Sequence, residues 1–378
     1  MIRNLWAAAF AFVLAAGTVS GQTEALKNAQ TGDPQIKSIQ ALTFGPNGEL
    51  VIGDGVNGQI VVIDTQDTKP MTWSKLEIND IAGKLAGRIG TTAKSIEIKN
   101  LAVNPASKKV YITVRNPGNK KDVLMTVDSQ GKIGEFVLDN VRHVRVDLPK
   151  GKGPTKLITD VTWAKDRILV TAQANETFAS KFLSIKLPLS PKSAGAVFSA
   201  ETYHVAHRRW ETRAPIRVAI PYEENGENYL VGAFTCTPVV KYRIDDMKPT
   251  GKIKGQSIIE LGSGNRPIDM FVYEKRTEKG KKKYILMNTY RFHHKRRPVG
   301  PSPFWTVRID FDLLAEDEEV NEKALKRVDG KYQPVTDRAV IVESFHGVTH
   351  MDKLNNQQAV AIRANKAGQF GLEVLPLP

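Results

Sequence analysis

Short apolar stretches alternate with turn residues along the chain, and the clearest example lies between Ile39 and Asp64. Three runs of mostly apolar or β-branched residues are separated there by Pro46-Asn47-Gly48 and by a second Gly-rich break near Asp54. Such runs are typical of half-buried strands, and Asn-Gly accepts the positive φ of a tight hairpin turn. The stretch therefore predicts strand, hairpin, strand, loop and strand. This is most of a four-stranded propeller blade or, alternatively, one meander of an ordinary sandwich.

Repetition separates these two alternatives. Weaker copies of the pattern follow at intervals of about 50 to 60 residues, with a longer last interval. The positions taken as equivalent in the first strand of each copy are Ala41, Leu101, Val161, Val218, Met270 and His350. Six units of this length fill residues 36–378. The sequence therefore predicts an all-β fold, a six-bladed β-propeller, with seven blades as the alternative.

Two stretches interrupt the strand pattern with helical spacing. The first runs from Asn79 to Gly90 and the second from Glu316 to Val328, and apolar residues recur every fourth position in both. Asn79 is placed to cap the first helix, and the second carries favourable Glu–Lys pairs four residues apart. We therefore expect two short helices inserted into the propeller.

The first 21 residues have the features of a secretory signal: one positive charge, an apolar run and a small-residue cleavage site. Residues 22–35 are polar and expected to be loosely ordered, and residues 36–378 are expected to form a single domain. No later stretch could span a bilayer, so no transmembrane segment is expected after signal cleavage. Cys236 is the only cysteine, which excludes an intramolecular disulfide. A secreted or periplasmic location follows from the signal.

The formal net charge is +14, which favours polyanionic partners such as an acidic glycan or an acidic protein. No nucleic-acid-binding module is present in the sequence, so nucleic acid is not an expected partner. No cofactor is expected under the leading interpretation.

If the fold is a propeller, its loops divide into two classes. The hairpins between the first and second strands of each blade are short and polar, without reactive groups. The remaining loops, which open on the other face, contain or adjoin all seven histidines, Cys236 and many arginines. We call this second face the loop-rich face and expect ligand binding there, because arginines interleaved with aromatic residues suit an anionic or sugar-like ligand. The candidate ligand-binding residues are His204, His207, Arg208, Trp210, Arg213, Arg266, Arg291 and His350.

A second set of polar residues stands at the start of apolar runs, where the inner strands would meet the central channel. They are Asn100, Asp160, Asp269 and Asp352. Their oxygen atoms form a hard ligand set suited to Ca²⁺ or another divalent metal. The alternative is structural, with each oxygen accepting backbone N–H groups between blades.

The first unit also resembles known propeller blades. It is similar to secreted propellers of the YVTN, NHL and quinoprotein-amine-dehydrogenase-like group over about 26 residues. The matching positions are Pro46, Asn47, Gly48, Leu50, Asp54, Gly58, Ile60 and Asp64. The resemblance implies the fold alone, because members of this group include enzymes, ligand binders and scaffolds.

These observations lead to one functional hypothesis and two alternatives. The leading hypothesis is a secreted or periplasmic propeller that binds a ligand or partner on the loop-rich face without catalysis. The first alternative is a divalent-metal-dependent hydrolase or lactonase, resembling the gluconolactonase-type six-bladed propellers, with the metal in the channel. The second alternative is a redox subunit. The absence of a C-x-x-C-H motif excludes covalently bound c-type haem as its redox group.

Overall fold

The computed structural model describes residues 25–149, 155–175, 177, 179–204, 209–236, 238–246, 251–261, 264–296, 298, 300–316 and 338–378. The predicted signal, and the predicted second helix beyond its first residue, lie outside these ranges. Among the described residues, no helix is long and apolar enough to cross a membrane.

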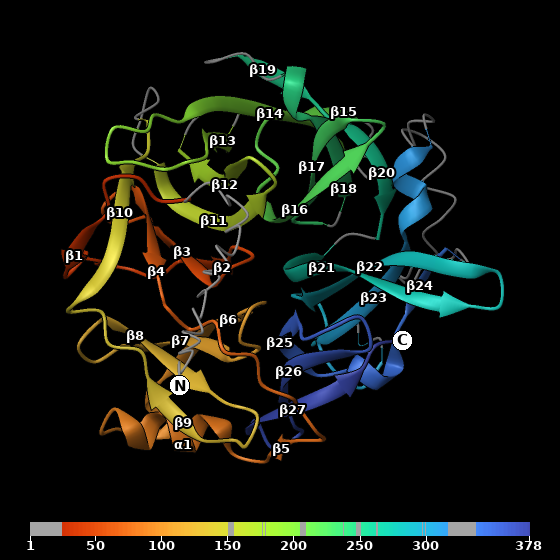
Figure 1. Cartoon of the computed structure of the whole chain (residues 1–378). Coiled ribbons are helices and arrows are strands. Elements are labelled where there is room, and N and C mark those ends of the chain that lie inside the picture. Colours follow the sequence, from red (N-terminus) through yellow and green to blue (C-terminus); the bar gives the residue numbers. More distant parts are fainter. Residues whose placement is uncertain are drawn as a thin grey trace, which may run out of the picture.

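The strands form six separate small sheets arranged in a ring, a six-bladed β-propeller (Figure 1). The prediction of six blades rather than seven is confirmed. We number the blades by their order along the chain. In every blade the first strand lies innermost, so that β2, β6, β11, β16, β21 and β25 surround the axis.

The strands of the first three blades have the following bounds. Blade 1 contains β2 (Ala41–Phe44), β3 (Glu49–Asp54) and β4 (Gln59–Asp64). Blade 2 contains β6 (Glu97–Val103), β7 (Val110–Asn116), β8 (Lys121–Val127) and β9 (Ile133–Glu135). Blade 3 contains β11 (Thr155–Ala164), β12 (Arg167–Ala174), β13 (Ser180–Lys186), β14 (Ala196–His204) and β15 (Arg209–Glu211), with β19 (Lys252–Lys254) paired to β14.

The last three blades are more regular. Blade 4 contains β16 (Ile216–Glu224), β17 (Glu227–Phe234), β18 (Pro238–Arg243) and β20 (Gln256–Glu260). Blade 5 contains β21 (Asn265–Thr277), β22 (Gly280–Arg291), β23 (Phe304–Asp310) and β24 (Ala339–Ile341). Blade 6 contains β25 (Val348–Lys353), β26 (Gln358–Ala364) and β27 (Phe370–Pro376).

The blades do not follow one another around the ring in chain order. The inner strand of blade 1 contacts those of blades 2 and 3, and the inner strand of blade 2 contacts that of blade 6. The order around the ring is therefore 1-3-4-5-6-2, and the chain moves backwards once, from blade 1 to blade 2 (Figure 1).

Two strands from the region around blade 2 tie this arrangement together. After blade 1 the chain supplies β5 (Glu77–Ile78), which pairs with β27 at the outer edge of blade 6. After blade 2 it returns as β10 (Val141–Asp147), which pairs with β4 at the outer edge of blade 1. A short strand, β1 (Gln30–Gly32), then pairs with β10. The ring is thus closed by strands that leave one blade to complete another.

Local sequence explains the turns and the α-helix of the described part of the chain. Asn225 and Gly226 both have positive φ, as a tight hairpin between β16 and β17 requires. The helix α1 (Ile81–Arg88) buries Ile81 and Leu85, and it is followed by the 3₁₀ turn η1 (Ala93–Ser95). Asp80 caps α1 by accepting a hydrogen bond from Gly83 N. The first inserted helix is therefore confirmed, but the prediction of Asn79 as its cap is wrong.

Two further expectations are corrected at the edge of blade 1. The segment before residue 36 is not loosely ordered where it is described: Leu26 is buried, and β1 joins a sheet. His143 is not near a loop of the loop-rich face. It lies buried on β10, with Nε2 3.1 Å from Gln30 Nε2 and Nδ1 3.0 Å from Val141 O. Six histidines rather than seven therefore remain candidates for that face.

Five of the six inner strands share one irregularity, a β-bulge at the same depth. In blades 2 to 6 the register with the second strand skips one residue at this depth, so that this residue has no partner across the sheet, and blade 3 has a further shift nearer the start of its inner strand. The skipped residues are Lys99, Thr159, Arg217, Ile268 and Thr349. A bulge bends its strand and changes where the side chain points, and all five residues line one cavity of the channel.

Candidate functional site

The channel along the ring axis contains a cavity at each end. One has a volume of about 370 Å³ and lies among the second halves of the inner strands, near the short hairpins. Asp160, Asp269 and Asp352 line it, and we call it the acidic cavity. The other has a volume of about 530 Å³ and lies among the first halves of the inner strands, at the loop-rich face. Because it is lined by Arg217 and Arg266, we call it the basic cavity.

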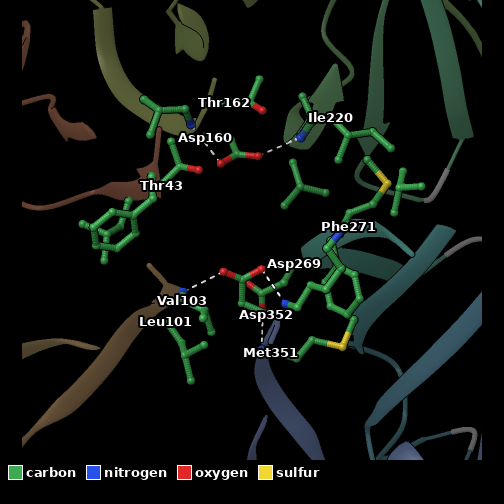
Figure 2. A pocket seen from close by; sticks show the side chains of 18 of the residues that line it. Thr43, Leu101, Val103, Asp160, Thr162, Ile220, Asp269, Phe271, Met351 and Asp352 are labelled. Carbon is green, nitrogen blue, oxygen red and sulfur yellow. Dashed lines mark hydrogen bonds between the residues drawn. The ribbon is translucent and has the colours of Figure 1, made fainter. Parts of the chain in front are cut away.

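The carboxylates of the acidic cavity accept hydrogen bonds from backbone N–H groups. Asp160 accepts from Val161 N (2.8 Å) and from Ala219 N of the next blade (2.8 Å). Asp269 accepts from Met351 N at 2.9 Å. Figure 2 shows these carboxylates around the opening.

Asp352 has the same kind of environment. It accepts from Val103 N of blade 2 at 2.7 Å and from Lys353 N at 2.6 Å. Every carboxylate of the acidic cavity therefore joins its own blade to a neighbour. This is the structural arrangement that the sequence left open as an alternative to metal binding.

Burial and mutual repulsion change the acidity of two of these groups. Burial, together with the negative charges of Asp269 and Asp352, raises the pKa of Asp160 to about 7 against the hydrogen bonds it accepts. Burial and the charge of Asp269 likewise raise the pKa of Asp352 to about 6. Near neutral pH the acidic cavity therefore carries less than its full formal negative charge.

The four candidate metal ligands do not come together. Asn100 lines the basic cavity, whereas Asp160, Asp269 and Asp352 line the acidic one. Nowhere in the described part of the chain do three or more His, Cys, Asp or Glu side chains form a group that could hold a metal ion. The residues present do not fit a four-ligand calcium site of the expected composition.

Polar side chains also bridge neighbouring blades near the bulges. Gln40 Oε1 accepts from Ile158 N (2.9 Å), and His350 Nε2 lies 3.2 Å from Ile98 O. Asn100 Nδ2 donates over 3.4 Å to Gln40 O. Together with the hydrogen bonds of Asp160 and Asp269, these contacts connect five of the six junctions between neighbouring blades. At the sixth, between blades 4 and 5, the residue after the bulge is Val218, which has no polar side-chain atom.

Arg217 and Arg266 lie at this sixth junction. Arg217 is the bulge residue of blade 4, and its Nε donates to Thr235 Oγ1 at 2.9 Å. Arg266 is the second residue of β21, the inner strand of blade 5, and its guanidinium carbon lies 5.4 Å from the centre of the Tyr290 ring. Among the described residues neither arginine has an acidic partner within ion-pair distance. Burial and the positive charge of Arg266 lower the pKa of Arg217.

The other charged groups of the basic cavity have partners or are exposed. Lys99 donates to Asp122 Oδ2 at 3.0 Å and to Ile39 O at 2.9 Å. His350 Nδ1 lies 3.6 Å from Asp269 Oδ2. Glu97 is exposed at the rim. The two arginines are therefore the cations of this cavity that lack a counter-ion among the described side chains, and the carboxylate of Glu97 belongs to the same lining.

The predicted ligand-binding residues fall into three groups. Arg266 and His350 line the basic cavity, as a binding role there requires. His204, Trp210 and Arg213 line a separate cavity of about 390 Å³ beside Cys236. Arg291 is buried, with its guanidinium carbon 4.7 Å from the centre of the Trp305 ring. His207 and Arg208 lie outside the described residues.

The thiol of Cys236 is not activated in that separate cavity. Burial raises its pKa, and the charges of Glu260 and Glu211 act in the same direction, against a hydrogen bond from Gly264. A raised pKa leaves little thiolate at neutral pH, so the geometry gives no support to a nucleophilic role.

Sequence reasoning missed Arg217 altogether. The residue stands between Ile216 and Val218 in a run that predicts an ordinary strand. A single charged residue at that point was the available signal, since its side chain would otherwise have to lie within an apolar strand.

Comparison with known proteins gives only distant similarities. No protein-family model matches the sequence, and no curated protein matches it significantly. Among solved structures, the PQQ-bound form of aldose sugar dehydrogenase from Streptomyces coelicolor is similar, with a TM-score of 0.36 and 10% identity over 92% of this chain and 98% of that chain. A chain of the mitotic checkpoint complex is similar with a TM-score of 0.33 and 7% identity over 99% of both chains. Similarity at this level carries no information about function.

Proposed function

We propose that this six-bladed propeller binds an anionic small molecule in the basic cavity at its loop-rich face, as a binding protein without chemistry of its own. The observation that carries the proposal is the pair Arg217 and Arg266, which face one cavity and lack acidic partners in the described chain. Two neighbouring cations repel each other, and a bound anion relieves that repulsion. Guanidinium groups also match the geometry of carboxylate and phosphate oxygens.

The surroundings of the pair support the proposal. A volume of about 530 Å³ is in the range of small-molecule sites. The Thr235 hydroxyl holds the guanidinium of Arg217, which reduces the conformational entropy lost when a ligand binds. The net charge of +14 draws anions toward the protein from a distance.

Isothermal titration calorimetry on the purified protein tests the proposal. The titrants are inorganic phosphate, citrate and octanoate, each at low and at high salt. We expect at least one anion to bind, and Arg266→Gln to weaken that binding by about tenfold or more, because a hydrogen bond to a charged group is lost.

Arg145→Gln is the matched control. Arg145 is also an exposed strand arginine, but it lies on β10 at the outer edge of blade 1, away from the channel. Its replacement should leave the affinity unchanged. If no anion binds, or if both variants lose affinity equally, the basic cavity is not an anion site.

The metal-dependent hydrolase is a second candidate because Asp160, Asp269 and Asp352 line one cavity, although among the described residues they do not by themselves form a group that could hold a metal ion. Mutual repulsion raises the pKa of Asp160 and Asp352, and a cation would relieve it. Metal analysis of the purified protein, together with melting curves in Ca²⁺ and in chelator, tests this. A stoichiometric divalent ion that is lost in Asp160→Ala would support the hydrolase. A metal-free protein whose melting temperature is unchanged by Ca²⁺ and by chelator would rule it out.

We also propose that the protein acts in a secreted or periplasmic compartment, because residues 1–21 have the composition of a secretory signal. N-terminal sequencing of the protein from its native host tests this. Cleavage near Gly21 is the expected result, and an intact Met1 would argue against it.

A further inference from the structure

We propose that the ligand of the basic cavity is amphipathic, with a compact anionic head bound at Arg217 and Arg266 and an apolar chain against the opposite wall. This inference rests on the proposed function and specifies its ligand class. It follows from the positions of charged and apolar side chains around the ring.

The cations lie on one side of the channel. Arg217 belongs to blade 4 and Arg266 to blade 5. With the ring order 1-3-4-5-6-2, blade 2 lies opposite blade 4 and blade 1 opposite blade 5 (Figure 1). A ligand that fills the cavity therefore has its far end near blade 2.

The wall on the blade 2 side contains a group of apolar residues next to the polar Glu97, Lys99 and Asn100 of β6, which line the same cavity. The chain that leads into blade 2 contributes Ala82 from α1, Ala93 from η1, and Ile96 and Ile98 around the start of β6. Phe370 of neighbouring blade 6 continues this surface. We call these five residues the apolar wall.

The apolar wall packs against the hydrophobic core on one side and faces the cavity on the other. Ile96, Ile98 and Phe370 pack against the hydrophobic core between blades 2 and 6 but stay only half-buried, and Ala93 is exposed. Half-buried apolar side chains that line a cavity gain free energy when an apolar group covers them. The inserted helix and 3₁₀ turn therefore add an apolar surface to a cavity whose opposite side is cationic.

The two features together exclude simpler ligands as the best fit. An inorganic anion would satisfy the arginines and leave the apolar wall in water. A neutral apolar molecule would cover the wall and leave two repelling guanidinium groups without a counter-ion. A molecule that has both an anionic head and an apolar chain satisfies both sides at once.

Binding of a homologous series of straight-chain carboxylates tests the inference. Butanoate, hexanoate and octanoate are titrated calorimetrically into the intact protein at concentrations where all three are monomeric. Affinity should rise about fourfold for each added methylene that becomes fully buried. Octan-1-ol, which has the chain without the charge, should bind at least tenfold more weakly than octanoate.

Variants then assign the two ends. Arg266→Gln should weaken all three carboxylates by a similar factor and keep the dependence on chain length. Ala93→Gln places a polar group on the apolar wall at an exposed position, so folding should be unaffected. It should reduce the gain per methylene and leave butanoate binding nearly unchanged. Val137→Gln, at an exposed apolar residue outside the cavity, is the matched control and should change neither quantity.

The outcomes separate this inference from the proposed function. Equal affinity for all chain lengths, with loss in Arg266→Gln, would overturn the amphipathic ligand and keep the anion site. Failure of every anion would overturn both. Octan-1-ol binding as tightly as octanoate would also overturn the inference. Octyl phosphate, titrated beside octanoate, shows whether the head is a phosphate or a carboxylate; tighter binding of either one agrees with the proposal.

Discussion

The two ends of the channel are built from the same inner strands, yet they treat charge in opposite ways. In the acidic cavity, each carboxylate accepts a hydrogen bond from a backbone N–H group of a neighbouring blade; the three residues are Asp160, Asp269 and Asp352. In the basic cavity, Arg217 is held by a hydroxyl, Arg266 lies beside an aromatic ring, and neither has a described acidic partner. Charge at the first end is used to join blades, whereas charge at the second end is available to a ligand.

This contrast shows why a ring of carboxylates is a poor guide to function in such a fold. A propeller must satisfy backbone groups where its inner strands approach the axis, and carboxylates do this well. Cations without acidic partners have no such structural use. The following predictions test the contrast, beginning with the largest expected effect.

Removing a bridging carboxylate should affect stability most. Asp352→Ala leaves two backbone N–H groups, those of Val103 and Lys353, without their acceptor. We expect the free energy of unfolding to fall by about 2–4 kcal/mol, measured by urea denaturation. Asp352→Asn, which keeps a carbonyl oxygen, should lose less. Arg266→Gln at the other end should change stability by about 0.5 kcal/mol or less. A large loss in Arg266→Gln and none in Asp352→Ala would reverse the assignment of the two ends.

The acidic cavity should also give the protein a pH dependence. The pKa of Asp160 is about 7 in the folded protein, whereas the ordinary value of 3.8 applies to the unfolded chain. The folded state therefore binds the proton more tightly. The stabilising contribution is complete below pH of about 4 and is lost as the pH rises through about 7. We expect a loss of about 2 kcal/mol over this range from this group, because Asp160 is only half-buried and solvent screening reduces the full effect.

Asp160→Asn should flatten this profile, whatever its stability at a single pH. Asp166, whose pKa is lowered mainly by its hydrogen bond with Arg167, shows the opposite sign. Asp166→Asn should therefore leave the loss between pH 4 and 7 in place. Equal slopes in the wild type and in Asp160→Asn would contradict the assigned cause.

The hydroxyl that positions Arg217 should affect binding and not stability. Thr235→Val removes the acceptor of the 2.9 Å hydrogen bond from Arg217 Nε. We expect the affinity for the tightest anion of the titrated panel to fall by about tenfold, since the guanidinium is no longer held. Thr235→Ser should restore binding. An unchanged affinity in Thr235→Val would mean that Arg217 needs no positioning.

The smallest effect concerns the repulsion between the two arginines. Without a ligand, Arg266→Gln removes a positive charge that lies close enough to lower the pKa of Arg217. We expect the variant to gain about 0.3–0.5 kcal/mol of stability at low salt, measured by thermal or urea denaturation. At high salt the difference should disappear because the repulsion is screened. A gain that persists at high salt would have another origin.

Much of the scaffold could be predicted from the sequence because its signals are local. The turns at Pro46-Asn47-Gly48 and Asn225-Gly226 mark hairpins by their backbone preferences alone, and both are present. Six repeats of the strand pattern gave the blade number. The separation of short hairpins from longer loops also correctly placed Arg266 and His350 at the loop-rich end of the channel.

The order of the blades could not be predicted in the same way. Strands of neighbouring blades have interchangeable apolar patterns, and nothing near Ile78 indicates that its partner is Leu372 of blade 6. Pairing between such distant segments depends on tertiary packing.

The bulges were missed for a related reason. No glycine marks them, so the alignment of the units slipped by one residue. In the structure, the residues directly after the bulges of blades 2 to 6 are Asn100, Asp160, Val218, Asp269 and His350. The sequence alignment groups Val218 and His350 with the residues one position later in the other blades. Asp352 lies two residues after His350 and is therefore not equivalent to Asp160 and Asp269. The slip hid Arg217, whose place in the cavity depends on the bulge.

The backward step from blade 1 to blade 2 has a consequence for synthesis of the chain. The strand β5 leaves the ribosome about 290 residues before β27, the strand with which it pairs. Until blade 6 has been made, the edge of β5 stays unpaired, and the apolar wall lacks Phe370. The ring therefore closes late, through contacts of very high sequence separation, which makes folding slow. The wall that we assign to the ligand is completed in the same event, so nascent chains that stop before blade 6 should have neither a closed ring nor a finished cavity.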